Sequence, residues 1–154
     1  MGAATRFLSN PPRVRAVHTS GTSLGNAAWG AVVWGGIDGS DYEGMVSGSR
    51  ITIPAAGRYL VSWQVGFAGD PDGGRFTQLR RGSLGSVTGG VAIAAARGLA
   101  IGSSTVFVGG TTDAAALAAG EYFELFAYQS SGGALALTPG AAETWISVRW
   151  VALD

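Results

Sequence analysis

The stretch "GRYLVSWQVGF" at residues 57–67 decides the fold. Apolar side chains recur at every second position from Tyr59 to Phe67, which is the period of a β-strand with one face in a core. After Arg58, the intervening positions carry Leu, Ser, Gln and Gly, whereas a solvated strand face normally carries charge. We therefore expect that the second face of this strand is also covered, by something outside the core.

The composition of the chain points to one domain that hides part of its surface in an assembly. The 154 residues suit a single domain with a proper core. Hydrophobic residues make up 47% of the chain and charged residues only 13%, whereas an ordinary soluble domain has about 25% charged residues. So few charges on so apolar a chain favour burial of some surface between subunits.

The charge and cysteine counts argue against several classes of partner and site. Ten basic residues balance ten acidic ones, so no basic field exists to attract nucleic acid or an anionic membrane. No apolar stretch approaches the roughly 18 residues that suggest a membrane span, and we expect no membrane partner. Cysteine is absent, which excludes disulfides, thiol catalysis and thiolate metal sites.

Turn and strand signals along the chain predict an all-β protein, a sandwich or a barrel, with roughly eight to ten strands and no long helix. The turn-rich "GDPDGG" at 69–74 predicts that 57–67 and 75–81 pair as antiparallel neighbours. Two segments stay open: 82–104 fits a strand, a loop or a helical turn, and 111–120 fits a short helix or a half-strand. The other expected strands are 13–20, 49–54, 103–109, 121–129 and 143–153.

Four stretches resemble, in order, the globular heads of the complement first-component and tumour-necrosis-factor superfamily: "ITIPAAGRYLVSWQVGF", "FVGG", "AAGEYFELFAYQ" and the terminal "WISVRWVAL". The shared features are a G-x-Y-x-aliphatic strand at Gly57, a G-acidic-x-apolar-x-Leu strand at Gly120, and a final apolar strand. Ile51 stands where the family usually has an aromatic residue. The resemblance implies a single jelly-roll β-sandwich of two antiparallel sheets, tumour-necrosis-factor-like and homotrimeric.

The family's trimers also imply what covers the second face of 57–67, because the back of their inner sheet packs on the threefold axis. The core set carried over to this chain is Tyr59, Val61, Trp63, Val65, Phe67, Phe123, Leu125, Ile146, Val148 and Trp150. The axis-facing set is Leu60, Ser62, Gln64, Phe107, Ser147, Arg149, Val151 and Leu153. The trimer interface is completed by Tyr122, Phe126 and Tyr128, which are expected to lie toward the neighbouring subunit.

Short prokaryotic members of this family with a "PPRVR" arm are reminiscent of bacteriophage virion proteins: head decorations, head fibres and tail-fibre tips. The resemblance implies a virion location and capsid or tail proteins as partners. Residues 1–12 lack a periodic pattern and end in Pro-Pro, so we expect an extended arm followed by a jelly-roll domain at 13–154. The residues expected to attach this arm to the particle are Phe7, Leu8, Pro11 and Pro12.

A receptor-binding or glycan-binding head of a tail fibre is the alternative function. Trp29 and Trp34 would stack on sugar rings in such a head, or would pack in the core or an interface if they are structural. The partner would then be a host-surface glycan or protein, and the same trimeric fold would carry the site.

Catalysis and metal binding receive little support from the sequence. His18 is the only histidine, and nothing places a serine and a carboxylate beside it as a triad requires. A glycan hydrolase needs two convergent carboxylates, and the acids here fall in turns and at strand ends. Asp38, Asp41 and Glu43 are calcium candidates by ligand type, but their spacing does not fit an EF-hand loop, and a solvated loop in which Asp and Gly set turns is the favoured interpretation. We expect no enzyme activity and no cofactor.

Overall fold

The computed structural model describes residues 10–153, and its regular structure consists almost wholly of antiparallel strands. The one helical segment in this range is the 3-10 turn η1 (Tyr42–Gly44). A turn of three residues cannot cross a bilayer, and none of residues 10–153 forms a longer apolar helix.

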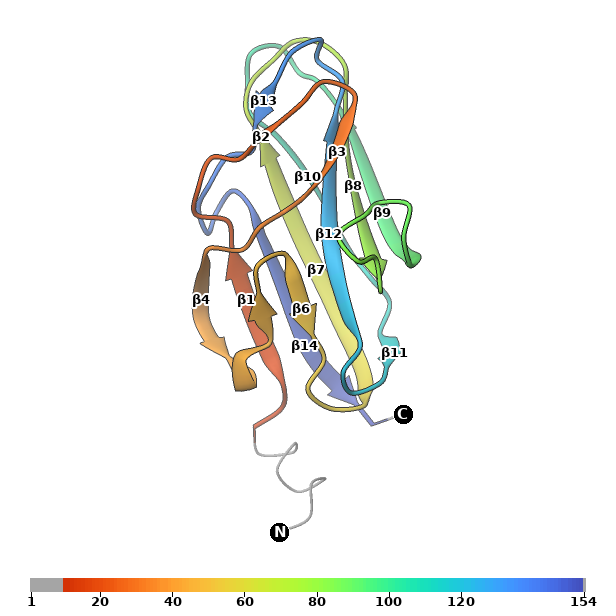
Figure 1. Cartoon of the computed structure of the whole chain (residues 1–154). Helices are drawn as coiled ribbons and strands as arrows, with labels where there is room; N and C mark the ends of the chain where they lie inside the picture. Colours follow the sequence, from red (N-terminus) through yellow and green to blue (C-terminus); the bar gives the residue numbers. More distant parts are fainter. Residues whose placement is uncertain (1–9, 154) are drawn as a thin grey trace.

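The strands form two six-stranded sheets that face one another (Figure 1). The β7 sheet has the order β10-β7-β14-β1-β4, with β11 also paired to β7. Its members are β1 (Arg13–Val17), β4 (Gly36–Asp41), β7 (Gly57–Phe67), β10 (Val106–Thr111), β11 (Ala115–Leu117) and β14 (Trp145–Ala152).

The second sheet, named here the β12 sheet, has the order β5-β6-β12-β8-β9, with β3 also paired to β12. Its members are β3 (Ala28–Ala31), β5 (Val46–Ser47), β6 (Arg50–Thr52), β8 (Gly74–Arg81), β9 (Val91–Leu99) and β12 (Tyr122–Gln129). A small two-stranded pair, β2 (Ser23–Leu24) and β13 (Leu135–Ala136), lies at the upper end of Figure 1.

The chain passes back and forth between the two sheets, which makes the architecture a jelly-roll sandwich as expected. This connectivity corrects one prediction: β7 and β8 are consecutive but do not pair. β7 pairs with β14, β10 and β11, whereas β8 pairs with β12 and β9. Residues 68–73 therefore carry the chain across to the other sheet. Turn residues alone cannot distinguish such a crossing from a hairpin.

The alternation of 57–67 is explained by the core between the sheets. Tyr59, Val61, Val65 and Phe67 are fully buried and Trp63 is 3% exposed. From the other expected core positions, Phe123, Leu125, Ile146 and Val148 are also fully buried, while Trp150 packs against the core but stays partly exposed. Burial of each large apolar side chain stabilises the fold by about 1.5–3 kcal/mol.

The two open segments are both strands. Residues 82–104 contain β9 at Val91–Leu99, and 111–120 contain β11 at Ala115–Leu117. Alanine favours a helix by intrinsic propensity, but pairing with β8 and β7 outweighs that preference in these short glycine-flanked runs.

The start of β1 and the end of β14 lie at the same end of the sandwich (Figure 1). Pro12 is buried, and its carbonyl oxygen accepts a hydrogen bond from the Trp150 N–H at 2.8 Å. Pro12 therefore already belongs to the folded body, and Pro11 beside it is half-buried. Phe7 and Leu8 lie outside the described residues.

Candidate interaction surfaces

The exposed face of the β7 sheet carries the eight residues expected to face a threefold axis. Leu60, Ser62 and Gln64 alternate with the core residues of β7 and are half-buried. Phe107, Val151 and Leu153 are 48%, 42% and 58% exposed, which is high for large apolar side chains.

The strand register places these positions in rows across the sheet. Ser62 lies opposite Ser147 on β14 and Thr111 on β10, and its hydroxyl is 3.0 Å from that of Thr111. Leu60 lies opposite Arg149. The Gln64 amide donates to the carbonyl of Ala142 at 2.8 Å. The middle of this face is therefore built from neutral residues.

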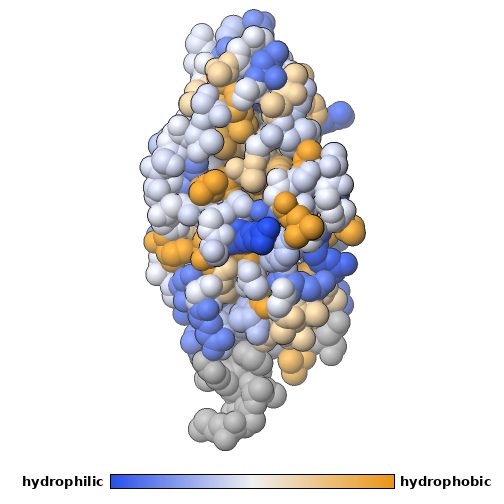
Figure 2. Space-filling view, viewed as in Figure 1, coloured by the Kyte–Doolittle hydropathy of each residue, from blue (hydrophilic) through white to orange (hydrophobic). Residues whose placement is uncertain are grey.

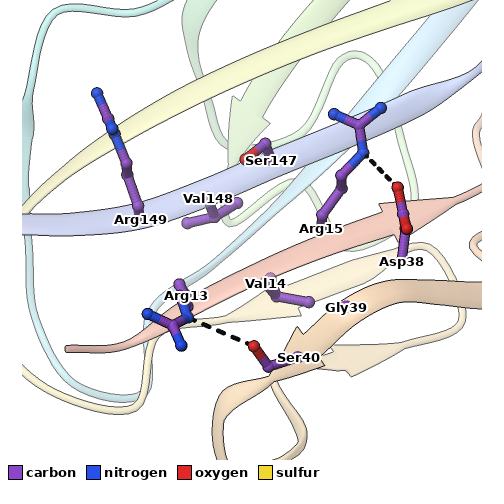
Figure 3. A pocket seen from close by; sticks show the side chains of 9 residues that line it. All are labelled: Arg13, Val14, Arg15, Asp38, Gly39, Ser40, Ser147, Val148 and Arg149. Atoms are coloured by element: carbon purple, nitrogen blue, oxygen red, sulfur yellow. Dashed lines mark hydrogen bonds and ion pairs between the residues drawn. The ribbon is translucent and has the colours of Figure 1, made fainter. Parts of the chain in front are cut away.

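Positive charge lies on the β1 side of the same face, around a hollow of about 250 Å³ lined by Arg13, Arg15 and Arg149, and at the start of β7, where Arg58 is exposed. Figure 3 shows Arg13 directed toward the Ser40 hydroxyl and Arg15 toward Asp38, with an Arg15–Asp38 ion pair of 2.9 Å. Arg149 lies directly opposite Arg13 in the strand register. Like charges directly opposite one another are destabilising, so Arg149 is the one charged residue of the expected interface that lacks local compensation among residues 10–153.

The remaining expected interface residues, Tyr122, Phe126 and Tyr128, lie on β12 in the other sheet. The sandwich core separates them from the eight residues above, so the structure does not bring the eleven together on one face. Phe126 is only 2% exposed. The two groups are separated because β12 and β7 belong to different sheets. Both strands alternate, but their outward faces lie on opposite sides of the molecule.

The outward face of the β12 sheet carries a row of aromatic side chains. Trp29 lies opposite Tyr128, and Tyr128 lies opposite Phe76. The ring centroids of Trp29 and Tyr128 are 5.2 Å apart, and those of Phe76 and Tyr128 are 5.5 Å apart. Trp29 is 38% exposed, whereas Trp34 is 5% exposed and belongs to the core. Of the two candidate sugar-stacking tryptophans, only Trp29 is placed to meet a ligand.

The surface seen from the viewpoint of Figure 1 carries several separate hydrophobic patches among hydrophilic residues (Figure 2). No continuous apolar band crosses this view.

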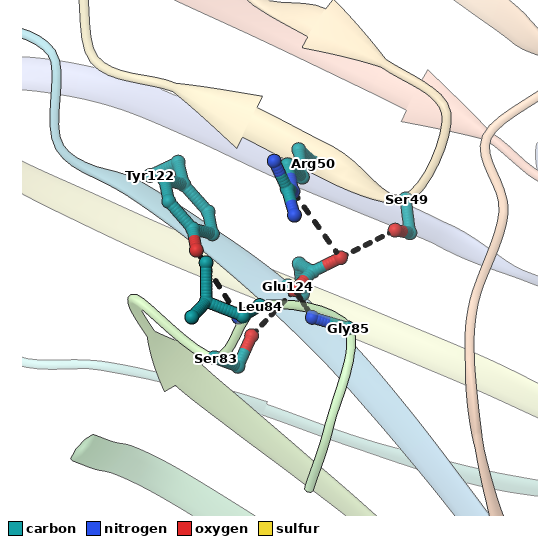
Figure 4. Close-up of polar contacts among 7 residues, drawn as sticks. All are labelled: Ser49, Arg50, Ser83, Leu84, Gly85, Tyr122 and Glu124. Atoms are coloured by element: carbon teal, nitrogen blue, oxygen red, sulfur yellow. Dashed lines mark hydrogen bonds and ion pairs between the residues drawn. The ribbon is translucent and has the colours of Figure 1, made fainter. Parts of the chain in front are cut away.

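Glu124 is the most extensively bonded carboxylate on the β12 sheet (Figure 4). It is 1% exposed and accepts hydrogen bonds from the Ser49 hydroxyl at 2.5 Å, the Ser83 hydroxyl at 2.6 Å and the Gly85 N–H at 2.8 Å. Arg50 lies 3.7 Å away. Burial by itself raises the pKa of Glu124, but these donors and the Arg50 charge together lower it below its usual value. Glu124 is thus an anchor for the 82–90 loop that is charged at neutral pH and is unsuited to donate a proton there.

The predicted calcium ligands do not converge. Asp38 pairs with Arg15, and the Asp41 carboxylate accepts the Met45 N–H at 2.8 Å. Glu43 lies in the turn η1. Among residues 10–153, no group of three or more acidic or histidine side chains is arranged to hold a metal ion.

The 69–74 turn holds a cation of its own, the guanidinium of Arg75. This side chain is fully buried and donates to the carbonyls of Asp72 at 3.0 Å, Gly74 at 3.1 Å and Asp70 at 3.3 Å. Those carbonyls are the oxygens that a metal ion in this turn would use. The turn is therefore stabilised by an arginine, which sequence spacing alone does not indicate.

His18 has a structural role. It is fully buried, its Nδ1 is 2.8 Å from the Val33 carbonyl, and its Nε2 accepts the Thr22 N–H at 3.3 Å. Both ring nitrogens are thus occupied by backbone groups. A buried imidazole with no free nitrogen cannot serve as a general base.

Comparison with known proteins supports the fold and leaves the family open. No protein-family model and no curated protein matches the sequence. Among solved structures, murine APRIL at pH 5.0 has a TM-score of 0.69 and 14% identity, covering 92% of this chain and all of that one. Eiger TNF from S. frugiperda has a TM-score of 0.66 and 15% identity, covering 94% and 96% of the two chains.

The globular domain of zebrafish complement 1qA protein has a TM-score of 0.63 and 12% identity, covering 93% of this chain and 99% of that one. These structures come from the two branches that the sequence resembles. At identities this low the likeness concerns the fold alone, and it identifies the chain as a tumour-necrosis-factor-like jelly roll.

Proposed function

We propose that this chain is a self-associating, homotrimeric jelly roll that serves as a non-enzymatic structural protein on a bacteriophage particle, bound to the capsid or the tail. The observation that carries the proposal is the exposed face of the β7 sheet. Large apolar side chains at Phe107, Val151 and Leu153 stand in solvent there, beside half-buried neutral residues.

Association through this face would remove those side chains from water. Each large apolar side chain that becomes buried contributes about 1.5–3 kcal/mol. The neutral middle of the face carries almost no charge that would have to be desolvated, and the low charge of the whole chain is consistent with it. The resemblance of the sequence to a trimeric superfamily supports three copies.

Mass measurement of a charged variant tests the self-association. We expect the wild-type protein to have a mass near three times the 15.6 kDa of the chain by light scattering at micromolar concentration. Val151→Asp would bring three carboxylates into a dry interface, where unpaired charges cost several kcal/mol each, so this variant should be monomeric.

Val33→Asp is the matched control, because Val33 is 46% exposed and lies outside the β7 sheet. It should assemble like the wild type. A monomeric wild-type protein, or a Val151→Asp variant that assembles normally, contradicts the proposed interface.

The proposed structural role on a phage particle rests on the N-terminal arm and on the lack of a catalytic arrangement among residues 10–153. His18 is buried, Asp38 pairs with Arg15 and Asp41 with the Met45 N–H, and among residues 10–153 no group of three or more acidic or histidine side chains comes together. The arm at 1–12 would hold the protein to a capsid or tail protein through Phe7, Leu8, Pro11 and Pro12.

A second candidate function, the receptor-binding or glycan-binding head of a tail fibre, is favoured by the exposed aromatic row at Trp29, Tyr128 and Phe76. Exposed aromatic rings beside a hollow are typical of ligand sites. This row lies on the opposite side of the sandwich from the proposed subunit interface, so the two functions are compatible.

A further inference from the structure

We propose that the β12 sheet carries a binding groove for an acidic saccharide, lined by Trp29, Phe76 and Arg97, with Tyr128 packed between the two rings. The inference rests on the second candidate function and adds the class of ligand, a sugar chain bearing carboxylate groups. It does not depend on self-association.

The four side chains form one row across four neighbouring strands. The register places Trp29 of β3 opposite Tyr128 of β12, Tyr128 opposite Phe76 of β8, and Phe76 opposite Arg97 of β9. Directly opposed residues of an antiparallel sheet project on the same side with neighbouring Cβ atoms. Three rings and one guanidinium therefore line up on the same surface.

A hollow lies along this row. One part, of about 330 Å³, is lined by Trp29, Phe76, Gln78, Ala95, Ala96 and Arg97 together with Thr77. A second part, of about 440 Å³, is lined by Phe76, Arg97, Gly98 and Leu99. Both parts share Phe76 and Arg97, so they adjoin one another, and each has the size of a small-ligand site.

The sequence of β9 keeps this groove open. Ala95 lies opposite Gln78, in the row next to the aromatic one. Larger β-branched residues, which are usual in strands, would fill the space beside Phe76. The alanine-rich composition of 82–104, which is compatible with several secondary structures, thus leaves this part of the surface hollow.

The polar groups of the groove are hydrogen-bond donors. Arg97 is exposed and has no hydrogen-bond or ion-pair partner among residues 10–153. The Gln78 Oε1 accepts from Arg80 at 2.9 Å, which leaves the Gln78 amide N–H groups as donors. No acidic side chain lines the groove.

This combination matches an acidic sugar better than a neutral one. The apolar C–H face of a sugar ring packs on an aromatic ring, which Trp29 and Phe76 supply. A free guanidinium binds a carboxylate through two parallel hydrogen bonds. Neutral sugars also require acceptors for their hydroxyl protons, and the groove side chains offer few.

The test uses isothermal calorimetry with three acidic oligosaccharides: oligogalacturonate, oligomannuronate and α2,8-linked oligosialic acid. The methyl ester of each is the matched neutral probe, since it keeps the ring and removes the charge. We expect at least one acidic probe to bind and its methyl ester to bind at least tenfold more weakly.

Three variants locate the site. Trp29→Ala should abolish binding. Arg97→Gln should weaken binding of the acidic probe at least tenfold and leave binding of its methyl ester unchanged. Arg13→Gln, which removes an arginine from the opposite sheet, should bind like the wild type. Thermal unfolding of each variant checks that it is folded, and Arg97 is exposed, so its variant keeps the test valid if Trp29→Ala fails to fold.

The outcomes separate this inference from the functions on which it builds. Equal binding of an acid and its ester overturns the acidic-sugar inference but leaves a glycan-binding head intact. Absence of binding to all six probes, or binding that survives both Trp29→Ala and Arg97→Gln, overturns the groove. The mass measurement on Val151→Asp is unaffected by either result.

Discussion

At the residue scale, two buried charges hold loops in place. Arg75 donates to the carbonyls of the 69–74 turn, and Glu124 accepts from donors on two loops that flank the β12 sheet. A buried charge is costly unless hydrogen bonds satisfy it. Each of these groups is satisfied mainly by uncharged partners from nearby loops, so each fixes loop geometry without a close buried ion pair.

The Glu124 cluster makes stability depend on pH. Because the pKa of Glu124 is lower in the folded protein than its ordinary value of 4.5, its contribution is complete above that pH and is lost as the pH falls below it. We expect the melting temperature of the wild type to fall between pH 5 and pH 3, measured by circular dichroism. Glu124→Gln should lower stability by about 1–3 kcal/mol at pH 7 and should flatten this dependence.

Asp113→Asn is the control, since Asp113 is exposed and has no partner among residues 10–153. Its melting temperature should fall with decreasing pH as steeply as that of the wild type. If the melting temperature of Glu124→Gln depends on pH as that of the wild type does, other carboxylates govern the loss of stability in acid.

At the scale of elements, β7 depends on a close approach at its first residue. Gly57 has φ 153°, and a Cβ there would overlap the Trp150 Nε1 and lie 2.7 Å from the Ala152 carbonyl oxygen. The glycine of the G-x-Y-x-aliphatic pattern is thus required because the end of β14 passes directly over it.

Gly57→Ala should therefore loosen the pairing of β7 with the end of β14. We expect a loss of about 1–3 kcal/mol, as for other overpacked sites, and faster hydrogen exchange at residues 150–152, measured by mass spectrometry. Gly133→Ala is the matched control, because nothing lies within 4 Å of a Cβ at that position. Protection at 150–152 that stays at the wild-type level in Gly57→Ala would contradict the steric account.

At the scale of the whole molecule, the sandwich separates two surfaces. The neutral face of the β7 sheet is proposed for self-association, and the aromatic groove of the β12 sheet is proposed for ligand binding. The core lies between them, so occupation of one face leaves the other accessible. The start of β1 and the end of β14 lie at the same end of the body (Figure 1).

Deletion of residues 1–9 tests the attachment arm without disturbing Pro12, whose carbonyl bonds to Trp150. We expect the shortened protein to keep the melting temperature and mass of the full chain, because the contacts of residues 10–153 remain. Its incorporation into phage particles, measured by mass spectrometry of purified particles, should be lost. Full occupancy by the shortened protein would refute the attachment role.

The sequence by itself determined the fold class and the two faces of the main strand. The period-two alternation of 57–67 depends only on local backbone geometry, and the burial of Tyr59 through Phe67 follows from it. The low charge of the intervening residues likewise identified the face proposed as an interface. Such patterns are local, so they are readable without knowledge of distant partners.

Only the tertiary structure decided which strands pair and which side chains share a surface. One partner of β7 is β14, which lies more than 70 residues away along the chain. No local feature of the sequence indicates that β7 pairs with β14 and that β8 pairs with β12 instead. The separation of Tyr128 from Leu60 and the alignment of Trp29 with Arg97 depend in the same way on register across four strands. Strand pairing is set by long-range packing, and the composition of a turn does not reveal which sheet the chain enters next.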